Sequence, residues 1–170
     1  MLRPMIATAV QFYDVVTFFH ISAVVIGFGP TFAYGLFQMA AANDGLRASL
    51  GVSRAIVRWN QTGTTWGMVL VLITGLYLVG DGPWSFSDFF ISWGFVAIVV
   101  LFGLAHGFFL PRERQVIAKL EEEVEAPGGD RKTEMSEGLQ LLEGQIAKVG
   151  AAAGILVLLT IYVMTAKPFL

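Results

Sequence analysis

Residues 18–37 read FFHISAVVIGFGPTFAYGLF, and this stretch decides the fold. It contains no Lys, Arg, Asp or Glu, and it has the length of about 20 residues with which a helix crosses a hydrocarbon core of about 30 Å. An open strand at that depth would leave backbone groups without hydrogen bonds, so the stretch predicts a membrane-spanning helix. The whole chain agrees, because 55% of its 170 residues are hydrophobic and 14% are charged.

Working outward from this stretch, four segments are long and apolar enough to span a membrane. We place them at about 12–37, 62–80, 89–110 and 146–166. The predicted fold class is therefore all-α: a polytopic membrane four-helix bundle forming a single integral membrane domain over residues 1–170. The lipid bilayer is its expected surrounding. The absence of cysteine excludes disulfides, thiolate metal sites and iron–sulfur clusters, and without a dense basic surface no nucleic-acid partner is expected.

Basic residues near the span ends set the orientation of a membrane protein. They gather in the two longer connections, between the first and second spans and between the third and fourth: Arg47, Arg54, Arg58, Arg112, Arg114, Lys119, Arg131, Lys132 and Lys148. The connection at 81–88 contains two Asp and no Lys or Arg. We therefore expect a multi-pass protein of the bacterial inner membrane, with both termini in the periplasm and both longer loops in the cytoplasm.

The second of these connections, 111–145, has helical periodicity of its own. Glu113, Ile117, Leu120 and Val124 recur at spacings of four and three, and APGGD at 126–130 then breaks the pattern. After Thr133 or Ser136 as a helix start, apolar residues again step by four and three at Met135, Leu139, Leu142, Ile146 and Val149. The pattern predicts a cytoplasmic antiparallel helical hairpin that extends the third and fourth spans. A solvated charged linker is the alternative.

Glycine and proline indicate how the spans bend and pack. Gly27-Phe28-Gly29-Pro30 interrupts the first span, and since proline removes a helical hydrogen bond, we expect a kink there. Gly63 with Gly67, and Gly150 with Gly154, form two GxxxG pairs. Such pairs let helix backbones approach closely, so both predict packing faces.

His20 is the ionisable side chain placed deepest in an apolar segment. It lies eight residues past Phe12, or roughly 12 Å inside the first span. Polar groups at such depth are costly and face the interior of a bundle. Three roles stay open for His20: a structural hydrogen bond, a haem or other metal ligand, or a proton relay.

His106, in the third span, is the weaker candidate for binding a cofactor. It lies roughly 6 Å from the opposite boundary, which leaves about 12 Å of depth between the two histidines. This mismatch disfavours one iron held by both, so a haem would be held by His20 alone or with a non-histidine ligand. Side chains at a comparable depth form a candidate polar pocket with His106, namely Thr31, Tyr34, Thr64, Thr65 and Trp66. The favoured interpretation of His106 is a structural histidine satisfied by a hydrogen bond to a hydroxyl or a carbonyl, and cofactor binding is the alternative.

The ionisable groups at the span edges have structural interpretations. Asp14 suits the N-terminus of the first helix, and Lys167 can extend toward the outer headgroups. Asp81 and Asp88 are expected to cap helices. Without paired carboxylates inside the spans, a nucleophile beside a base or a phosphate-binding loop, the sequence identifies no catalytic residue, and enzyme activity is not expected.

Three motifs carry a family resemblance: FFHISAVVIGFGPTFAYGLF at 18–37, VLITGLYLV at 71–79 and LLTIYVMTAKPF at 158–169. With these, the chain resembles a bacterial family of predicted integral membrane proteins of unknown function, domain of unknown function 2269. More distantly it is similar to copper-resistance D-type proteins and to four-helix protoporphyrinogen oxidase-type proteins that contain haem b. The resemblance implies that His20 is a haem or metal position, with haem b as the candidate cofactor.

The sequence thus favours an accessory or haem-linked component of a bacterial membrane system, for example a respiratory one. A partner membrane protein, or a second copy of the chain, would contact its spans or its hairpin. A small transporter or channel component is the alternative, for which the kinked first span and the two histidines are the arguments.

Overall fold

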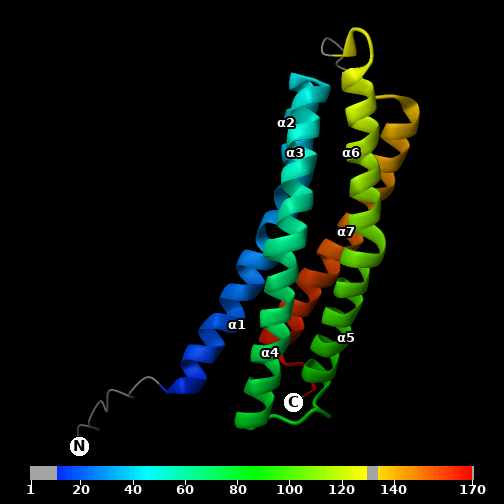
Figure 1. The fold of residues 1–170 in the computed structure, drawn as a ribbon. Helices are drawn as coiled ribbons and strands as arrows, with labels where there is room; N and C mark the ends of the chain where they lie inside the picture. Colours follow the sequence, from blue (N-terminus) through cyan, green and yellow to red (C-terminus); the bar gives the residue numbers. More distant parts are fainter. Residues whose placement is uncertain (1–10, 130–133, 170) are drawn as a thin grey trace, which may run out of the picture.

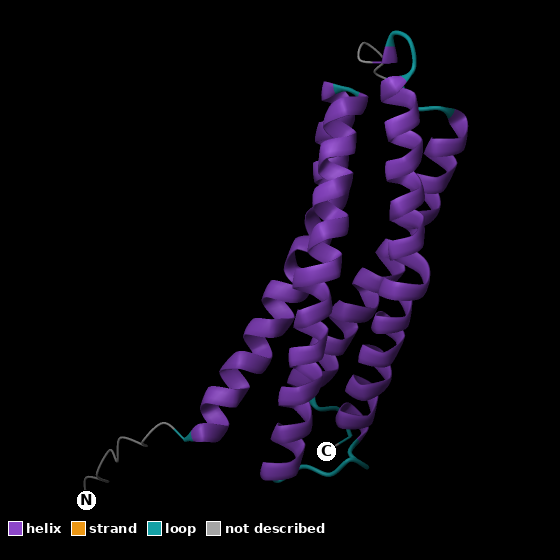
Figure 2. Cartoon of the chain, in the orientation of Figure 1, coloured by secondary structure: helices purple, strands orange, loops and turns teal. Residues whose placement is uncertain are grey.

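The computed structural model describes residues 11–129 and 134–169, and in that part of the chain every regular element is helical (Figures 1 and 2). The α-helices are α1 (Phe12–Phe28), α2 (Tyr34–Asp44), α3 (Leu46–Trp59), α4 (Thr65–Asp81), α5 (Phe89–Leu104), α6 (Leu110–Glu125) and α7 (Glu137–Ala166). Three short segments join consecutive helices without a loop: a 3₁₀ turn at Gly29–Ala33 and π-helical turns at Asn60–Thr64 and Ala105–Phe109.

These elements combine into four rods that are long and apolar enough to cross a membrane: Phe12–Asp44, Leu46–Asp81, Phe89–Glu125 and Glu137–Ala166. The start of α1 and the end of α7 lie at the same end of the molecule, at the bottom of Figure 1. We call this the terminal end, and the opposite end the hairpin end. The predicted all-α, polytopic membrane architecture is confirmed. Where the bilayer boundaries fall along the rods stays a prediction.

The connection between the first two spans is not a loop, and here the prediction was wrong. The chain is helical up to Asp44, turns at Gly45 and is helical again from Leu46. Gly45 has a φ of 107°, a conformation that favours glycine, which explains why the turn takes a single residue. α3 forms because Leu46, Leu50 and Ile56 share one buried face while its arginines lie on the other.

The predicted second hairpin is confirmed. α6 continues the third rod, and α7 begins at Glu137 after Ser136. Thr133, the other expected helix start, lies outside the described residues. Together the two hairpins form a bundle with its own core at the hairpin end: Leu46, Leu50, Val116, Leu120, Val124 and Leu139, with Met135, Leu142 and Ile146 packed against it. Leu120 and Leu139 are fully buried.

A second core lies at the middle of the molecule and takes one buried residue from each rod. Phe28 of α1, Met68 of α4, Leu101 of α5 and Val157 of α7 pack together there. Large side chains on the other faces of these rods are exposed, as expected for surfaces that contact lipid chains. The four rods therefore form one bundle, as the sequence predicts.

The predicted kink in the first span takes the form of the 3₁₀ turn at Gly29–Ala33, with Pro30 in its first turn. Just before it, α1 touches α4 backbone to backbone. A Cβ built on Gly67 would lie 2.8 Å from the Cα of Gly27, and a Cβ on Gly27 would lie 3.2 Å from the Cα of Gly67. Gly67, from the first GxxxG pair, therefore packs as predicted, whereas Gly63 is covered by the ring of Trp59.

The second GxxxG pair packs against aromatic side chains instead of a helix backbone. A Cβ on Gly154 would lie 3.4 Å from the ring of Phe32, and one on Gly150 would lie 3.9 Å from the ring of Phe109. The small residues of α7 thus make room for rings from the neighbouring rods.

The terminal end is closed by a cluster of aromatic rings. Val79, Phe90, Ile91 and Val163 are buried there, with Trp84 and Trp93 packed on them. The Lys167 ammonium lies 3.8 Å from the centre of the Trp84 ring. Lys167, expected to extend toward headgroups, thus folds back onto the bundle, because a cation is attracted to the face of an indole ring.

The acidic residues near the span edges have local partners. Asp14 accepts a hydrogen bond from the backbone N–H of Gln11 at the start of α1, and Asp88 accepts one from the backbone N–H of Ser85 before α5. Asp14 thus matches its expected place at a helix N-terminus. Asp88 occupies the N-cap position of α5, but its side chain makes no capping hydrogen bond to that helix. Asp81 differs, since it lies in the last turn of α4 and accepts a hydrogen bond from Tyr77.

Candidate functional site

His20 lies on α1 against α4, where two consecutive residues form its contact. Its Nδ1 is 2.9 Å from the hydroxyl oxygen of Thr74. The neighbouring Gly75 leaves room for the ring, because a Cβ at that position would lie 3.3 Å from Cε1 of His20. The Nδ1 edge of the imidazole is therefore held between α1 and α4.

The hydrogen bonds of Thr74 indicate which ring nitrogen of His20 carries the proton. The Thr74 hydroxyl has a single proton, which it donates to the backbone oxygen of Leu70 at 2.6 Å. It must then accept from His20, so we assign Nδ1 as the protonated nitrogen. In a neutral imidazole of this tautomer, Nε2 keeps its lone pair and can bind a metal.

His106 is placed differently from the prediction. It lies in the π-helical turn Ala105–Phe109 and is exposed, with its ring 4.3 Å from that of Phe102 on its own rod. In the described part of the chain it makes no hydrogen bond with the side chains expected to share its pocket. The predicted polar pocket around His106 is wrong, and the structure does not show the two histidines brought together.

The polar side chains expected near His106 instead gather around Asn60. Its Oδ1 accepts a hydrogen bond from the Tyr34 hydroxyl at 2.8 Å, and its backbone oxygen accepts one from the Thr65 hydroxyl at 2.7 Å. Its amide nitrogen lies 2.8 Å and 3.1 Å from the two carboxyl oxygens of Glu113. The Thr64 hydroxyl lies 3.1 Å from the backbone oxygen of Gly27. This Asn60 cluster links three of the four rods.

Glu113 is the buried charge-bearing group of this cluster. It is 9% exposed and follows the predicted crossing segment 89–110 by one turn of helix. Burial raises the pKa of its carboxyl above the ordinary value, because the charged form loses hydration; the hydrogen bond from Asn60 lowers it by a smaller amount. A second acid of the hairpin end, Glu143, also has its pKa raised by burial.

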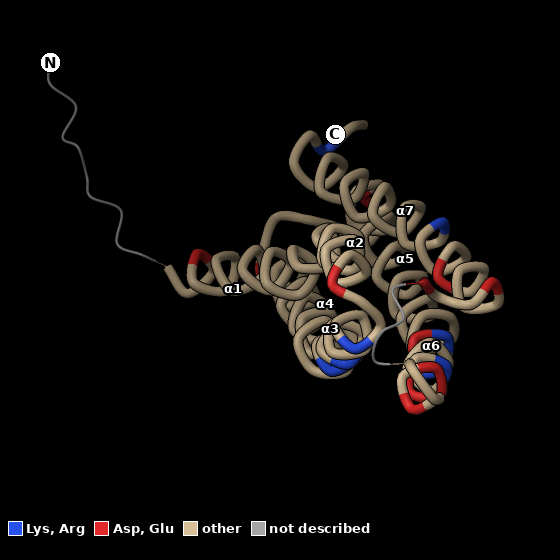
Figure 3. The backbone as a smooth tube through the Cα atoms, turned by 90° about the horizontal axis from the view of Figure 1, so that it is seen from above, with Lys and Arg blue, Asp and Glu red and all other residues tan. Residues whose placement is uncertain are grey.

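Charged side chains concentrate on the hairpin bundle. Viewed from that end, basic residues lie on α3, and both signs lie on α6 (Figure 3). Arg54 of α3 and Glu121 of α6 form an ion pair at 2.7 Å. Both are largely solvated, so the pair contributes little stability, but it lies between the two hairpins that share the buried core.

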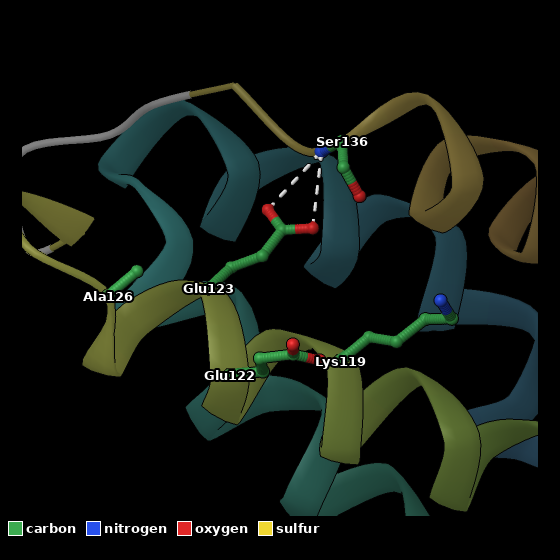
Figure 4. A pocket seen from close by; sticks show the side chains of 5 residues that line it. All are labelled: Lys119, Glu122, Glu123, Ala126 and Ser136. Atoms are coloured by element: carbon green, nitrogen blue, oxygen red, sulfur yellow. Dashed lines mark hydrogen bonds between the residues drawn. The ribbon is translucent and has the colours of Figure 1, made fainter.

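A shallow depression at the tip of α6 is lined by Lys119, Glu122, Glu123, Ala126 and Ser136 (Figure 4). The Glu123 carboxylate accepts a hydrogen bond from the backbone N–H of Ser136 at 3.2 Å, which fixes the start of α7. This use of Glu123 is structural. In the described residues, no group of three or more His, Cys, Asp or Glu side chains is placed to hold a metal ion.

Two residues of the Asn60 cluster escaped the sequence analysis. Glu113 was placed in the helical periodicity of its segment, with Ile117, Leu120 and Val124, and no partner was predicted for it. Asn60 was part of an amphipathic segment read as a loop. One signal could have identified both: a Glu in register with buried apolar residues needs a buried hydrogen-bond donor on a neighbouring helix.

These features define an integral membrane protein of four long helical rods, with a polar cluster at the base of a two-hairpin bundle. The chain matches the family described as predicted integral membrane protein (DUF2269) over residues 14–168, and it belongs to that family. No curated protein and no solved structure matches it.

Proposed function

We propose that this protein is an accessory component of a bacterial inner-membrane system that binds haem b through Nε2 of His20. The observation that carries the proposal is the bond from His20 Nδ1 to Thr74, since Thr74 donates its own proton to Leu70. Histidines that bind metals commonly donate their other ring nitrogen to a fixed acceptor, which sets the tautomer and the ring orientation. When bound, haem b would supply one-electron redox chemistry.

The composition of the segments around His20 also suits a haem ligand, in addition to the tautomer of its imidazole. α1 and α4 are apolar on both sides of His20, and Gly75 leaves the imidazole space against α4. An apolar, water-poor surrounding favours a neutral imidazole, the form that binds iron. His106 remains a weaker candidate ligand, on a different rod.

An accessory role agrees with the shape of the molecule. Both hairpins project past the predicted crossing segments, and the rods carry large exposed apolar side chains. A partner membrane protein, or a second copy of the chain, would contact these surfaces, with both termini in the periplasm and the hairpins in the cytoplasm. A small transporter or channel component stays the alternative prediction.

An absorption spectrum of the full chain, purified from its native membrane, tests the proposal. We expect a Soret band in the wild type that is lost in His20→Ala. Thr74→Val should retain a band but lose haem roughly 10- to 100-fold more readily, the usual effect of removing a partner of a metal ligand. The measurement is the ratio of Soret to protein absorbance during haem titration.

His106→Ala is the matched comparison, because it removes the other histidine of the spans. We expect its Soret band to match that of the wild type. A spectrum without a Soret band in the wild type, or an unchanged band in His20→Ala, would contradict haem binding at His20.

A further inference from the structure

Glu113 lies where three of the four rods depart from regular α-helix. Counted from the terminal end, α1, α4 and α5 contain 17, 17 and 16 residues before the 3₁₀ turn and the two π-helical turns begin. At 1.5 Å per residue, each irregular turn therefore lies about 25 Å from the terminal end. The three irregular turns thus lie at one level, between the apolar rods of the terminal end and the bundle that the two hairpins form. Such π-helical turns are frequent at functional sites.

The carboxyl of Glu113 has an unusual set of partners at this level. Although it is nine-tenths buried, both of its oxygens face the same neutral group, the amide nitrogen of Asn60. Elsewhere the Asn60 side chain is occupied by Tyr34, and Thr64 lies 3.3 Å from its Oδ1. Neutral donors of this kind compensate only part of the cost of burying a carboxylate.

No cation lies within ion-pair distance of Glu113 among the described residues. The charged and titratable side chains of the elements packed around Glu113 either have other partners or lie away from its carboxyl. Arg54 pairs with Glu121, the Arg112 guanidinium lies 3.8 Å from the centre of the Phe108 ring, and Tyr34 donates to Asn60. The remaining ones on α3, the π-helical turn, α6 and α7 are exposed or half-buried: Arg47, Arg58, His106, Arg114, Lys119, Glu122, Glu123, Glu125, Glu137, Glu143 and Lys148.

We propose that Glu113 is a proton-binding site at the junction of the two bundles, which holds a neutral carboxylic acid in the folded protein. The step is the addition of one proton from water to one carboxylate oxygen, and it removes one negative charge from the buried cluster. It needs no other reactant. The proposal is independent of haem binding at His20, which lies on another pair of helices.

The hydrogen bonds of Asn60 can accommodate the proton. A carboxylic acid donates through its O–H, and the nitrogen that now faces Glu113 cannot accept. If the Asn60 amide turns over, its oxygen accepts from Glu113, and its nitrogen donates to the Tyr34 and Thr64 oxygens. Every member of the cluster then keeps a partner, with Tyr34 changing from donor to acceptor toward Asn60, so the same residues serve both protonation states.

Infrared spectroscopy of the full chain in lipid vesicles at neutral pH tests the proposal. We expect a carbonyl stretching band of a protonated carboxyl in the wild type and a weaker or absent band in Glu113→Gln; any remainder should disappear when Glu143, the other acid whose pKa burial raises, is also replaced by Gln. Glu122→Gln on the same helix, where the side chain is exposed, should keep the full band. Absence of the band in the wild type, or an undiminished band in Glu113→Gln, would overturn the assignment.

The pH dependence of stability is a second readout, and it does not rely on comparing band intensities between variants. A glutamate that holds its proton more tightly in the folded chain stabilises the fold fully below its ordinary pKa of 4.5. That stabilisation is lost as pH rises through the raised pKa of the folded state. We expect the thermal unfolding midpoint of the wild type to fall over this interval and that of Glu113→Gln to change less. Parallel profiles of the two proteins would contradict the proposal.

Discussion

Replacing Gly67 with alanine is expected to destabilise the bundle by about 1–3 kcal/mol, the usual cost of adding a methyl group to a well-packed interior. The new Cβ would lie 2.8 Å from the Cα of Gly27, so the methyl meets backbone, which cannot rotate away as a side chain can. The α1–α4 contact would have to widen. Unfolding of the purified protein by a denaturing detergent measures the loss.

Two other glycines make this prediction specific. Gly27→Ala places a Cβ 3.2 Å from the Cα of Gly67 and should cost less. Gly80→Ala, also on α4, meets nothing within 4 Å and should be neutral or slightly stabilising, because alanine favours helix more than glycine does. Equal stabilities of the three variants would show that α1 and α4 do not touch at these residues.

Leu120→Ala is expected to destabilise the hairpin bundle by about 2–5 kcal/mol. Leu120 is 0% exposed and lies in the core that α3, α6 and α7 share, so the substitution leaves a cavity among three helices. Amide hydrogen exchange is the suitable measurement, since it reports separately on each helix. Protection should fall in α3, α6 and the first turns of α7, and should persist in the apolar parts of α4 and α5.

Leu141→Ala is the matched control on the same hairpin. Leu141 is 64% exposed, so the same chemical change removes few contacts. Its exchange pattern should resemble that of the wild type. If Leu120→Ala left the protection of α3 unchanged, the two hairpins would not share a core.

The sequence predicted the elements whose signal lies within one helix. The hydrophobic length around His20 indicated the first span, Pro30 its break, and the spacing of Leu120 and Leu139 the second hairpin. The first hairpin was not predicted although Leu46, Leu50 and Ile56 have helical spacing, because the arginines between them are typical of a solvated loop. A single turn-forming residue, Gly45, also gives a weaker signal than a run such as APGGD.

The candidate sites were harder to predict because they depend on how helices face one another. A structural hydrogen bond was one of three roles left open for His20, and the sequence did not indicate its partner, because Thr74 is 54 positions away on α4. His106 was expected to face inward from its depth alone. The π-helical turn that contains it holds an extra residue per turn, and one residue rotates a side chain by about 100° around the helix axis.

The rod that contains both Arg54 and Gly75 runs without a loop from Leu46 to Asp81. At 1.5 Å per residue its 36 residues extend about 54 Å, well beyond a hydrocarbon core of about 30 Å. If the rod crosses at 62–80, as the sequence predicts, residues 46–61 lie beyond the hydrocarbon core. Because no loop interrupts this rod, Thr74, which contacts His20, and Leu46 and Leu50 of the hairpin core belong to one continuous helical segment.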